Sequence, residues 1–404
     1  MGQFASSRHA VGRASGKLLL FGEHAAVYGY PAVGTALPLY TTVTVRLPAG
    51  STATTVFPGT ENQQDWKQLE IDCTTIDEED RPAVEAVLKR LFRTLSDEEM
   101  SSGNRAARKL LQPREPAERQ GTRRRQGDGP AGGTLSISSS VPRGMGLGSS
   151  AALCAALAAA ALPEAPSLRR WRVANELERE FHGTPSGVDT GLATLGGAHA
   201  FQFGQGDLPR QTPIILPEGA LLAGAVRREG STRTLIAGLK ARIEAAELEP
   251  QGALAGLGTL SAAVAETLTA GTGRPTRAAT IAELGGYADR AHEMLAGWGL
   301  STVLLDRVLE CGRVNGATGG KLSGAGGGGA FFLLFPNLPA AKGACAAIRA
   351  LLREASPGAT LPDPPLLVLD TAEINAAGSS HAGVYAVTND TPSSPARSPA
   401  ERDR

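Results

Sequence analysis

The sequence has few cysteines, no excess charge and no long apolar run, and each absence argues against a class of protein. Its four cysteines form no Cys-x-x-Cys pair, and its six histidines form no His-x-x-x-His pair. This argues against a disulfide framework or a zinc site and predicts reduced thiols in a cytoplasmic protein. Forty basic residues balance forty acidic ones, so the charge indicates neither nucleic acid nor an anionic membrane as a partner.

Long hydrophobic segments are also absent. The longest apolar run, Ala151–Leu162, falls well short of the about 20 residues that a membrane-spanning helix needs. The first residues have no extended apolar core, so a secretory signal is not predicted. Gly2 and Ser6 fit the loose N-myristoylation pattern, which is common by chance.

The order of segments predicts two domains of the α+β class. A chain of 404 residues exceeds the usual size of one core, and strand-like and helix-like segments alternate in both halves. We expect one domain over 12–212 and a second over 213–385. Residues 1–11 and 386–404 are expected to be a disordered leader and tail. The charged, Gly- and Pro-rich stretch 96–133 is expected to be a mobile surface insertion.

Apolar periodicity predicts individual elements. Residues 14–37 are expected to form strands joined by tight turns. Further strands are expected at 39–47, 134–142, 194–203, 221–226, 330–335 and 365–370. Helices are expected at 82–95, 149–162, 167–181, 231–248, 253–270, 277–297, 301–315 and 339–355.

The stretch PRGMGLGSSAAL, Pro142–Leu153, puts glycines and serines at the start of a predicted helix. The first N–H groups of a helix lack intrahelical partners, and the helix dipole adds partial positive charge there. Glycines remove the Cβ atoms that would hold an anion away, and serine hydroxyls can bind a phosphate oxygen or magnesium. The stretch therefore predicts a phosphate-binding loop, the alternative being a Gly-rich turn with a serine N-cap. Its members are Gly144, Gly146, Gly148, Ser149 and Ser150.

A second glycine cluster lies in KLSGAGGGGAFFLLF. Gly324, Gly326 and Gly329 match Gly-x-Gly-x-x-Gly, but they precede a predicted strand instead of following one. The dinucleotide fingerprint needs the opposite order, which disfavours a Rossmann dehydrogenase. The cluster can still bring bare backbone close to a ligand or to the first loop.

Two further stretches carry the charged groups that phosphoryl transfer requires. GKLLLFGEH contains Lys17, Glu23 and His24, and ELEREFHGTPSGVD contains Glu178 and Asp189. A lysine can neutralise a transferring phosphoryl group, one carboxylate can hold magnesium, and another can act near the attacking hydroxyl. Taken singly, the same residues are also compatible with a surface lysine, a structural histidine, a helix-surface glutamate and a capping aspartate.

Together and in this order, these stretches resemble the GHMP kinase superfamily. GEHAAVYGYPAVGTAL and HGTPSGVD are most similar to the mevalonate kinase family, whereas the Thr-Asp expected after Gly-Glu-His in galactokinases is absent. The similarity runs from about Ala14 to about residue 370, without 96–133. It implies a GHMP-type N-terminal domain, a ferredoxin-like C-terminal domain and an active site between them.

The resemblance further implies ATP-dependent phosphorylation of the C5 hydroxyl of mevalonate with Mg²⁺. Asp189 would orient and deprotonate the hydroxyl with Lys17 beside it, and Ser150 and Glu178 would hold the metal. The residues at the ATP phosphates would be Pro142, Gly144, Gly146, Leu147, Gly148, Ser149, Ser150 and Ala151. Those at the substrate would be Lys17, Glu23, His24, Asp189, Thr232 and Gly326. A homodimer is common in the family, and no nucleic-acid or membrane partner is implied.

Two departures bear on the substrate. Gly230 stands where some relatives carry an arginine, and LLAGAV lacks a frequent Asp-Thr-Gly. Phosphomevalonate or homoserine kinase activity therefore stays open, the former needing a basic anchor from Arg227, Arg228 or Arg233. A catalytically silent metabolite sensor of the same fold is the alternative from another functional class.

Overall fold

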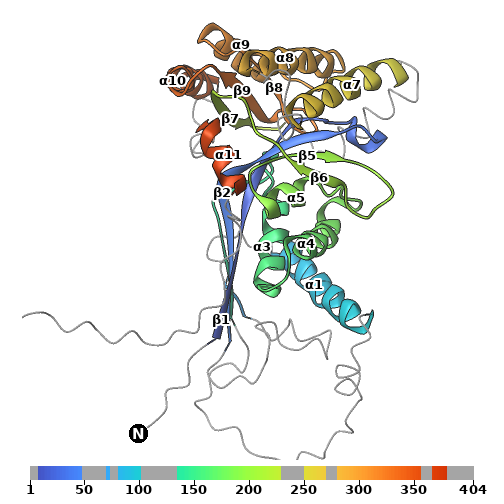
Figure 1. Ribbon diagram of the computed structural model, residues 1–404. Coiled ribbons are helices and arrows are strands. Elements are labelled where there is room, and N and C mark those ends of the chain that lie inside the picture. The colour runs from blue at the N-terminus through green and yellow to red at the C-terminus, as the bar shows by residue number, and fades with distance from the viewer. Residues whose placement is uncertain are drawn as a thin grey trace, which may run out of the picture.

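Two sheets organise the protein in the computed structural model (Figure 1). The structure describes residues 8–47, 70–72, 81–101, 134–228, 250–269, 280–355 and 366–379. The first sheet has six strands in the order β3-β4-β2-β5-β6, with β1 paired to β2, and the second has four in the order β10-β7-β9-β8. This mixture of sheets and helices confirms the α+β class.

The first sheet and its helices are formed by the N-terminal part of the chain. Its strands are β1 (Arg8–Phe21), β2 (Ala32–Leu47), β3 (Glu70–Asp72), β4 (Thr134–Ser139), β5 (Ala198–Gln202) and β6 (Arg210–Pro213). Its helices are η1 (Ala26–Tyr28), α1 (Arg81–Ser101), α3 (Ser149–Ala161), α4 (Ser167–His182) and α5 (Val188–Leu195). In Figure 1, α1, α3 and α4 lie together beside the long β1–β2 ribbon.

The second sheet follows with its own helices. Its elements are β7 (Ala220–Val226), α7 (Pro250–Thr269), α8 (Ile281–Gly297), α9 (Val303–Val314), β8 (Gly319–Leu322), β9 (Gly329–Phe335), α10 (Leu338–Ala355), β10 (Leu366–Asp370) and α11 (Thr371–Ser379). Numbered within this half, its four strands occur in the spatial order 4-1-3-2. That order, with helices in the two crossover connections, is the ferredoxin-like arrangement that the resemblance implied.

Pairing of β1 with β2 corrects the expected leader. Arg8 pairs with Leu47, and Val11 pairs with Thr44, so residues 8–11 belong to the sheet and are not disordered. Ala10 is buried. The strand is retained because β2 satisfies its backbone hydrogen bonds and the adjoining core takes its small side chains.

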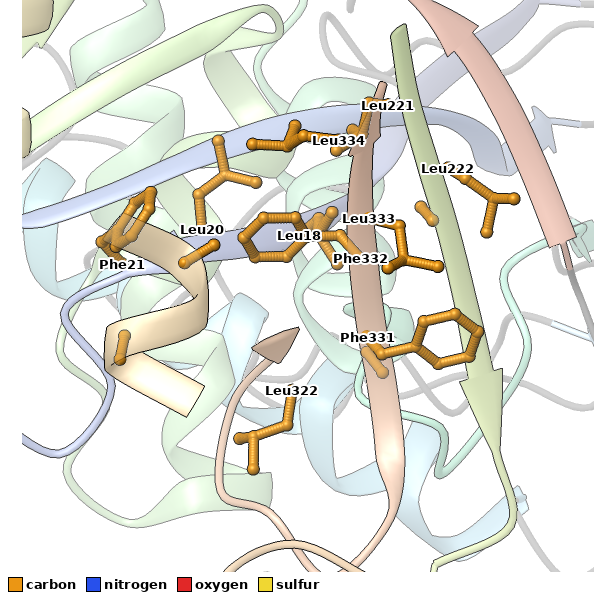
Figure 2. Packing of buried hydrophobic residues seen from close by; sticks show 14 of the residues in the cluster. Leu18, Leu20, Phe21, Leu221, Leu222, Leu322, Phe331, Phe332, Leu333 and Leu334 are labelled. Atoms are coloured by element: carbon orange, nitrogen blue, oxygen red, sulfur yellow. The ribbon is translucent and has the colours of Figure 1, made fainter. Parts of the chain in front are cut away.

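One core joins the two sheets. Leu18, Leu20 and Phe21 of β1 belong to the same buried cluster as residues of β7 and β9 (Figure 2). The rings of Phe21 and Phe332 meet edge to face with their centroids 6.3 Å apart. All seven positions of β9 are buried, because helices cover one face of its sheet and β1 packs against the other. This shared core fixes how the two halves face each other.

Several elements differ from the sequence predictions. Helix α1 continues to Ser101, six residues beyond the predicted end, and η1, β3, α5, β6, β8 and α11 were not predicted. Their sequences are short or rich in glycine, so local propensity gave no signal and tertiary packing decided their structure. The predicted helix 231–248, most of the insertion 96–133 and the tail lie outside the described residues. Within the described chain, no helix has the length and apolarity needed to cross a membrane.

Helix α3 approaches β1 closely because both surfaces carry very small side chains. A Cβ on Gly12 would lie 2.0 Å from the Ala156 carbonyl oxygen and 2.4 Å from the Ala160 nitrogen. These are backbone atoms of α3, which can move away only if the whole helix moves. Nine of its residues, mostly alanines, are buried.

We predict that Gly12→Ala destabilises the protein by about 1–3 kcal/mol, because overpacking forces α3 away from β1. The matched control is Gly343→Ala in α10, where an added Cβ meets nothing within 4 Å and helix propensity predicts a gain of up to about 1 kcal/mol. Urea denaturation of both variants measures the difference. Equal stability of the two variants would contradict the close packing of α3.

Candidate active site

A cavity of about 890 Å³ lies where the two halves meet. Its wall includes most residues that the sequence predicted for one site, namely Lys17, Glu23, His24, Gly144, Gly146, Gly148, Ser149, Ser150, Glu178 and Asp189. The second glycine cluster contributes Gly324 and Ala325. Residues separated by some 300 positions in the chain therefore share one cleft.

The first glycine loop has the backbone that its composition predicted. Gly144, Gly146 and Gly148 have φ values of 69°, 81° and 85°, a left-handed region that residues with a Cβ rarely adopt. Helix α3 begins directly afterwards at Ser149, so its unpaired N–H groups and positive dipole end face the cavity. A loop with this backbone at the start of a helix is suited to binding an anion.

Lys17 and Asp189 form an ion pair beside this loop. The Nζ–Oδ2 distance is 3.0 Å, and the side chain of Lys17 is 6% exposed whereas that of Asp189 is 40% exposed. Lys17 comes from β1, and Asp189 stands in the first turn of α5. The Asp189 carboxylate is thus accessible from the cavity, and its ion pair with Lys17 holds it in one orientation.

Glu178 lies next to the start of α3 and contacts two cavity residues. Ser150 Oγ donates to Glu178 Oε1 at 2.8 Å, and His182 Nε2 lies 3.2 Å from the same oxygen. The hydrogen bond between His182 and Glu178 raises the pKa of His182. Glu178 is buried, and among the described residues its Oε2 has no hydrogen-bond partner. A buried carboxylate oxygen with a hydroxyl beside it is a donor set suited to a divalent cation.

Glu23 forms a fully buried ion pair with Lys321 of β8, which joins the two halves. Lys321 also donates to the Leu322 carbonyl at 2.6 Å, and the Gly324 N–H donates to Glu23 Oε1 at 3.4 Å. Burial raises the pKa of Glu23 and lowers that of Lys321, and each charge partly opposes the effect on its partner. Within the described chain, Glu23 Oε2 has no partner.

His24 follows with a strained backbone. Its φ is 59°, a positive value that residues other than glycine rarely adopt. Such a conformation is retained only where surrounding contacts enforce it. Burial lowers the pKa of His24 to about 4, although a hydrogen bond to the backbone of Ala325 acts in the opposite direction. The ring is therefore neutral near pH 7, and its buried Nε2 has no partner among the described residues.

Several predicted site residues do not line the cavity. Leu147 buries its side chain, and its carbonyl accepts the Lys17 N–H at 2.9 Å. Ala151 packs in the core, and Pro142 is not among the residues that line the cavity. A Cβ on Gly326 would lie 2.5 Å from the Leu300 carbonyl oxygen, so this glycine supports the loop from behind. Thr232 lies outside the described residues.

Part of the cavity wall is apolar. Its side chains come from α1, β4, α3 and α4, and they are Ala83, Val84, Ile137, Leu153 and Phe181. Four of them, all except Ala83, belong to or pack against one buried cluster. Such a surface is suited to a flat, largely apolar group.

Three site residues were missed or left without a role by the sequence reasoning. Lys321 stands at the head of the second glycine cluster, but only the tertiary structure brings it to Glu23. His182 lies one helical turn after Glu178, a spacing that could have indicated contact. Arg228 lines the cavity, and the sequence had offered it only as one of several anchors.

Comparison with known proteins identifies two matching families. Residues 107–197 match the description "GHMP kinases N terminal domain", and residues 280–354 match "GHMP kinases C terminal". The mevalonate kinase of Thermococcus onnurineus is 28% identical over 331 residues, covering 80% of this chain and 88% of that protein.

Solved structures share the fold. The L. major mevalonate kinase in complex with R-mevalonate superimposes with a TM-score of 0.63 at 19% identity, covering 92% of this chain and 99% of that one. The Streptococcus pneumoniae phosphomevalonate kinase gives 0.60 at 15% identity, covering 90% and 99%. The fold alone therefore does not distinguish a mevalonate kinase from a phosphomevalonate kinase.

We predict that Lys321→Met destabilises the protein by about 3–5 kcal/mol, because it leaves the Glu23 carboxylate buried without its partner. The double variant Glu23→Gln/Lys321→Met should recover most of this loss, since no buried charge remains. Lys342→Met, at an exposed lysine of α10, is the control. Guanidinium denaturation measures all three variants. A Lys321→Met loss no greater than that of the control would contradict the buried pair.

Proposed function

The chain belongs to the GHMP kinase superfamily of phosphotransferases, and from this premise we propose that it phosphorylates the C5 hydroxyl of (R)-mevalonate with ATP. The products are 5-phosphomevalonate and ADP. The observation that carries the proposal is the Lys17–Asp189 pair beside the left-handed glycine loop in one cavity. It puts a base, a cation and a phosphate-binding loop within reach of one small substrate.

The chemistry follows from these three groups. An alcohol has a pKa far above neutrality, so Asp189 accepts its proton late, as the bond from oxygen to phosphorus forms. Lys17 neutralises charge on the phosphoryl oxygens and keeps the aspartate oriented. The amides at the start of α3 hold the nucleotide phosphates in place.

Ser150 and Glu178 fit the magnesium ion that accompanies ATP. Mg²⁺ commonly uses one or two carboxylates together with substrate phosphates and water. Glu178 Oε2, which has no hydrogen-bond partner among the described residues, and the adjacent Ser150 hydroxyl supply that kind of donor set. The described residues contain no group of three or more His, Cys, Asp or Glu side chains for a metal, which agrees with a site completed by phosphates. When bound, the ion would neutralise phosphate charge.

The other lining residues support a proposal for where each substrate binds. We assign the nucleotide base to the apolar side chains Val84, Ile137 and Phe181. We assign mevalonate to Glu23 and His24, whose Oε2 and Nε2 are buried polar atoms without partners in the described chain. Such atoms are stabilised by hydroxyl groups of a ligand, and mevalonate carries two hydroxyls and a carboxylate.

The test is a coupled assay of ADP release by the full-length protein with ATP and Mg²⁺. Mevalonate, phosphomevalonate and homoserine are offered as rival substrates, and the highest kcat/KM is expected with mevalonate. Preference for phosphomevalonate or homoserine would replace the substrate assigned here. Nucleotide binding without turnover of any of the three would favour a sensor.

We predict that Asp189→Asn and Lys17→Met each lower kcat by about 10²–10⁴-fold, because the first removes the base and the second removes charge neutralisation. Lys89→Met, at an exposed lysine of α1, is the matched control and should keep the activity of the parent protein. Circular dichroism verifies that each variant is folded. Near-normal turnover by either site variant would remove that residue from the mechanism.

A further inference from the structure

We propose that Arg228 is a second catalytic cation, whose guanidinium contacts the terminal phosphoryl group of ATP while Lys17 contacts it from the other side. This inference rests on the proposed kinase function, and it goes beyond it by assigning a role to a residue that the comparisons do not identify.

The backbone position of Arg228 is fixed by the second sheet. Strand β7 ends at Val226, which pairs with Gly329 at the start of β9. Two residues later, Arg228 lines the cavity together with the first glycine loop. Its neighbour Arg227 is exposed to solvent and does not line the cavity. Only Arg228 of these two arginines therefore faces the site.

The guanidinium lies in space that Gly146 and Gly329 leave open, and Gly324 lies next to it. A Cβ on Gly146 would lie 2.8 Å from Arg228 Nη2, and one on Gly329 would lie 2.8 Å from Nε. A Cβ on Gly324 would lie 3.9 Å from Nη2. Gly146 belongs to the first glycine loop, and the other two belong to the second. The guanidinium is therefore wedged between both loops, directly beside the predicted phosphate site.

Lys17 reaches the same loop through another glycine. A Cβ on Gly148 would lie 2.6 Å from Lys17 Cγ and 3.3 Å from Cε. Gly146 and Gly148 thus admit one cation each, Arg228 from the second half of the chain and Lys17 from the first. Gly146 and Gly148 therefore have two effects. They allow the positive φ values of the loop, and they leave room for two positively charged side chains beside it.

Asp189 interacts with both cations. It forms the ion pair with Lys17 and also attracts the charge of Arg228, although burial lowers the pKa of this arginine. An arginine stays protonated and presents a planar fork of donors that matches phosphate oxygens.

The reaction gives this cation a defined task. The substrate hydroxyl oxygen forms a bond to the γ-phosphorus as the bond from that phosphorus to the ADP oxygen breaks, and the hydroxyl proton passes to Asp189. Charge spreads over the three equatorial phosphoryl oxygens during transfer, and an arginine placed there is worth about 10³–10⁵-fold in rate in GTPases. Contact with the loop at Gly146 favours this role over an anchor for a phosphorylated substrate.

The experiment compares Arg228→Gln, Arg228→Lys and the matched control Arg227→Gln in the full-length protein. Titrations measure the affinity of each for ADP and for the non-hydrolysable β,γ-imido analogue of ATP, both with Mg²⁺. We expect Arg228→Gln to weaken binding of the analogue at least about tenfold while ADP binding stays unchanged, because the lost contact is to the terminal phosphate. Arg228→Lys should retain part of the preference, and Arg227→Gln all of it.

Kinetics supply the second readout. Arg228→Gln should lower kcat with mevalonate by at least about 10²-fold, with little change in the KM for mevalonate. Equal loss of ADP and analogue binding, or a binding preference equal to that of the control, would overturn the proposal. A normal kcat for mevalonate with a selectively raised KM for phosphomevalonate would overturn it as well. If the parent protein phosphorylates no alcohol, the kinase assignment fails, and the ratio of analogue to ADP affinity still decides whether Arg228 contacts a terminal phosphate.

Discussion

The close contact between α3 and β1 is the constraint on which the rest of the site depends. Gly12 removes a Cβ that would collide with the backbone of α3, and Gly16 removes one that would lie 2.9 Å from the Leu147 carbonyl oxygen. That carbonyl accepts a hydrogen bond from the Lys17 N–H at 2.9 Å. The backbone of the glycine loop and the backbone of Lys17 are thus held together directly. The distance between these two segments therefore does not depend on the conformation of flexible side chains.

The second half of the chain completes the site through buried charge. Lys321 holds Glu23, and Arg228 enters between the two glycine loops. Both contacts join the two halves of the chain. The apolar core shared by β1, β7 and β9 holds these halves in a fixed relative position. A buried ion pair adds little net stability, because desolvation offsets its attraction. Its effect here is orientation, because Lys321 holds one carboxylate oxygen of Glu23 in place.

Sequence reasoning was most successful where function requires a rare backbone or a fixed spacing. Gly144, Gly146 and Gly148 were predicted as a loop, and all three have positive φ. The order of the four stretches predicted the superfamily, which the two matching domains confirm. The same reasoning was wrong for residues 8–11, because strand pairing with residues far along the chain decides whether an N-terminal segment is ordered.

The sequence by itself determined the glycine loop, the helix that follows it and the identity of the groups available for phosphoryl transfer, because these depend on local conformation and residue chemistry. Only the tertiary structure decided which of them meet. It brought Lys17 to Asp189, Lys321 to Glu23 and Arg228 to the glycine loops, and it turned Leu147 and Gly326 away from the cavity. Such contacts join residues that are distant in the chain, so they depend on how two sheets pack around one core, which no local pattern records.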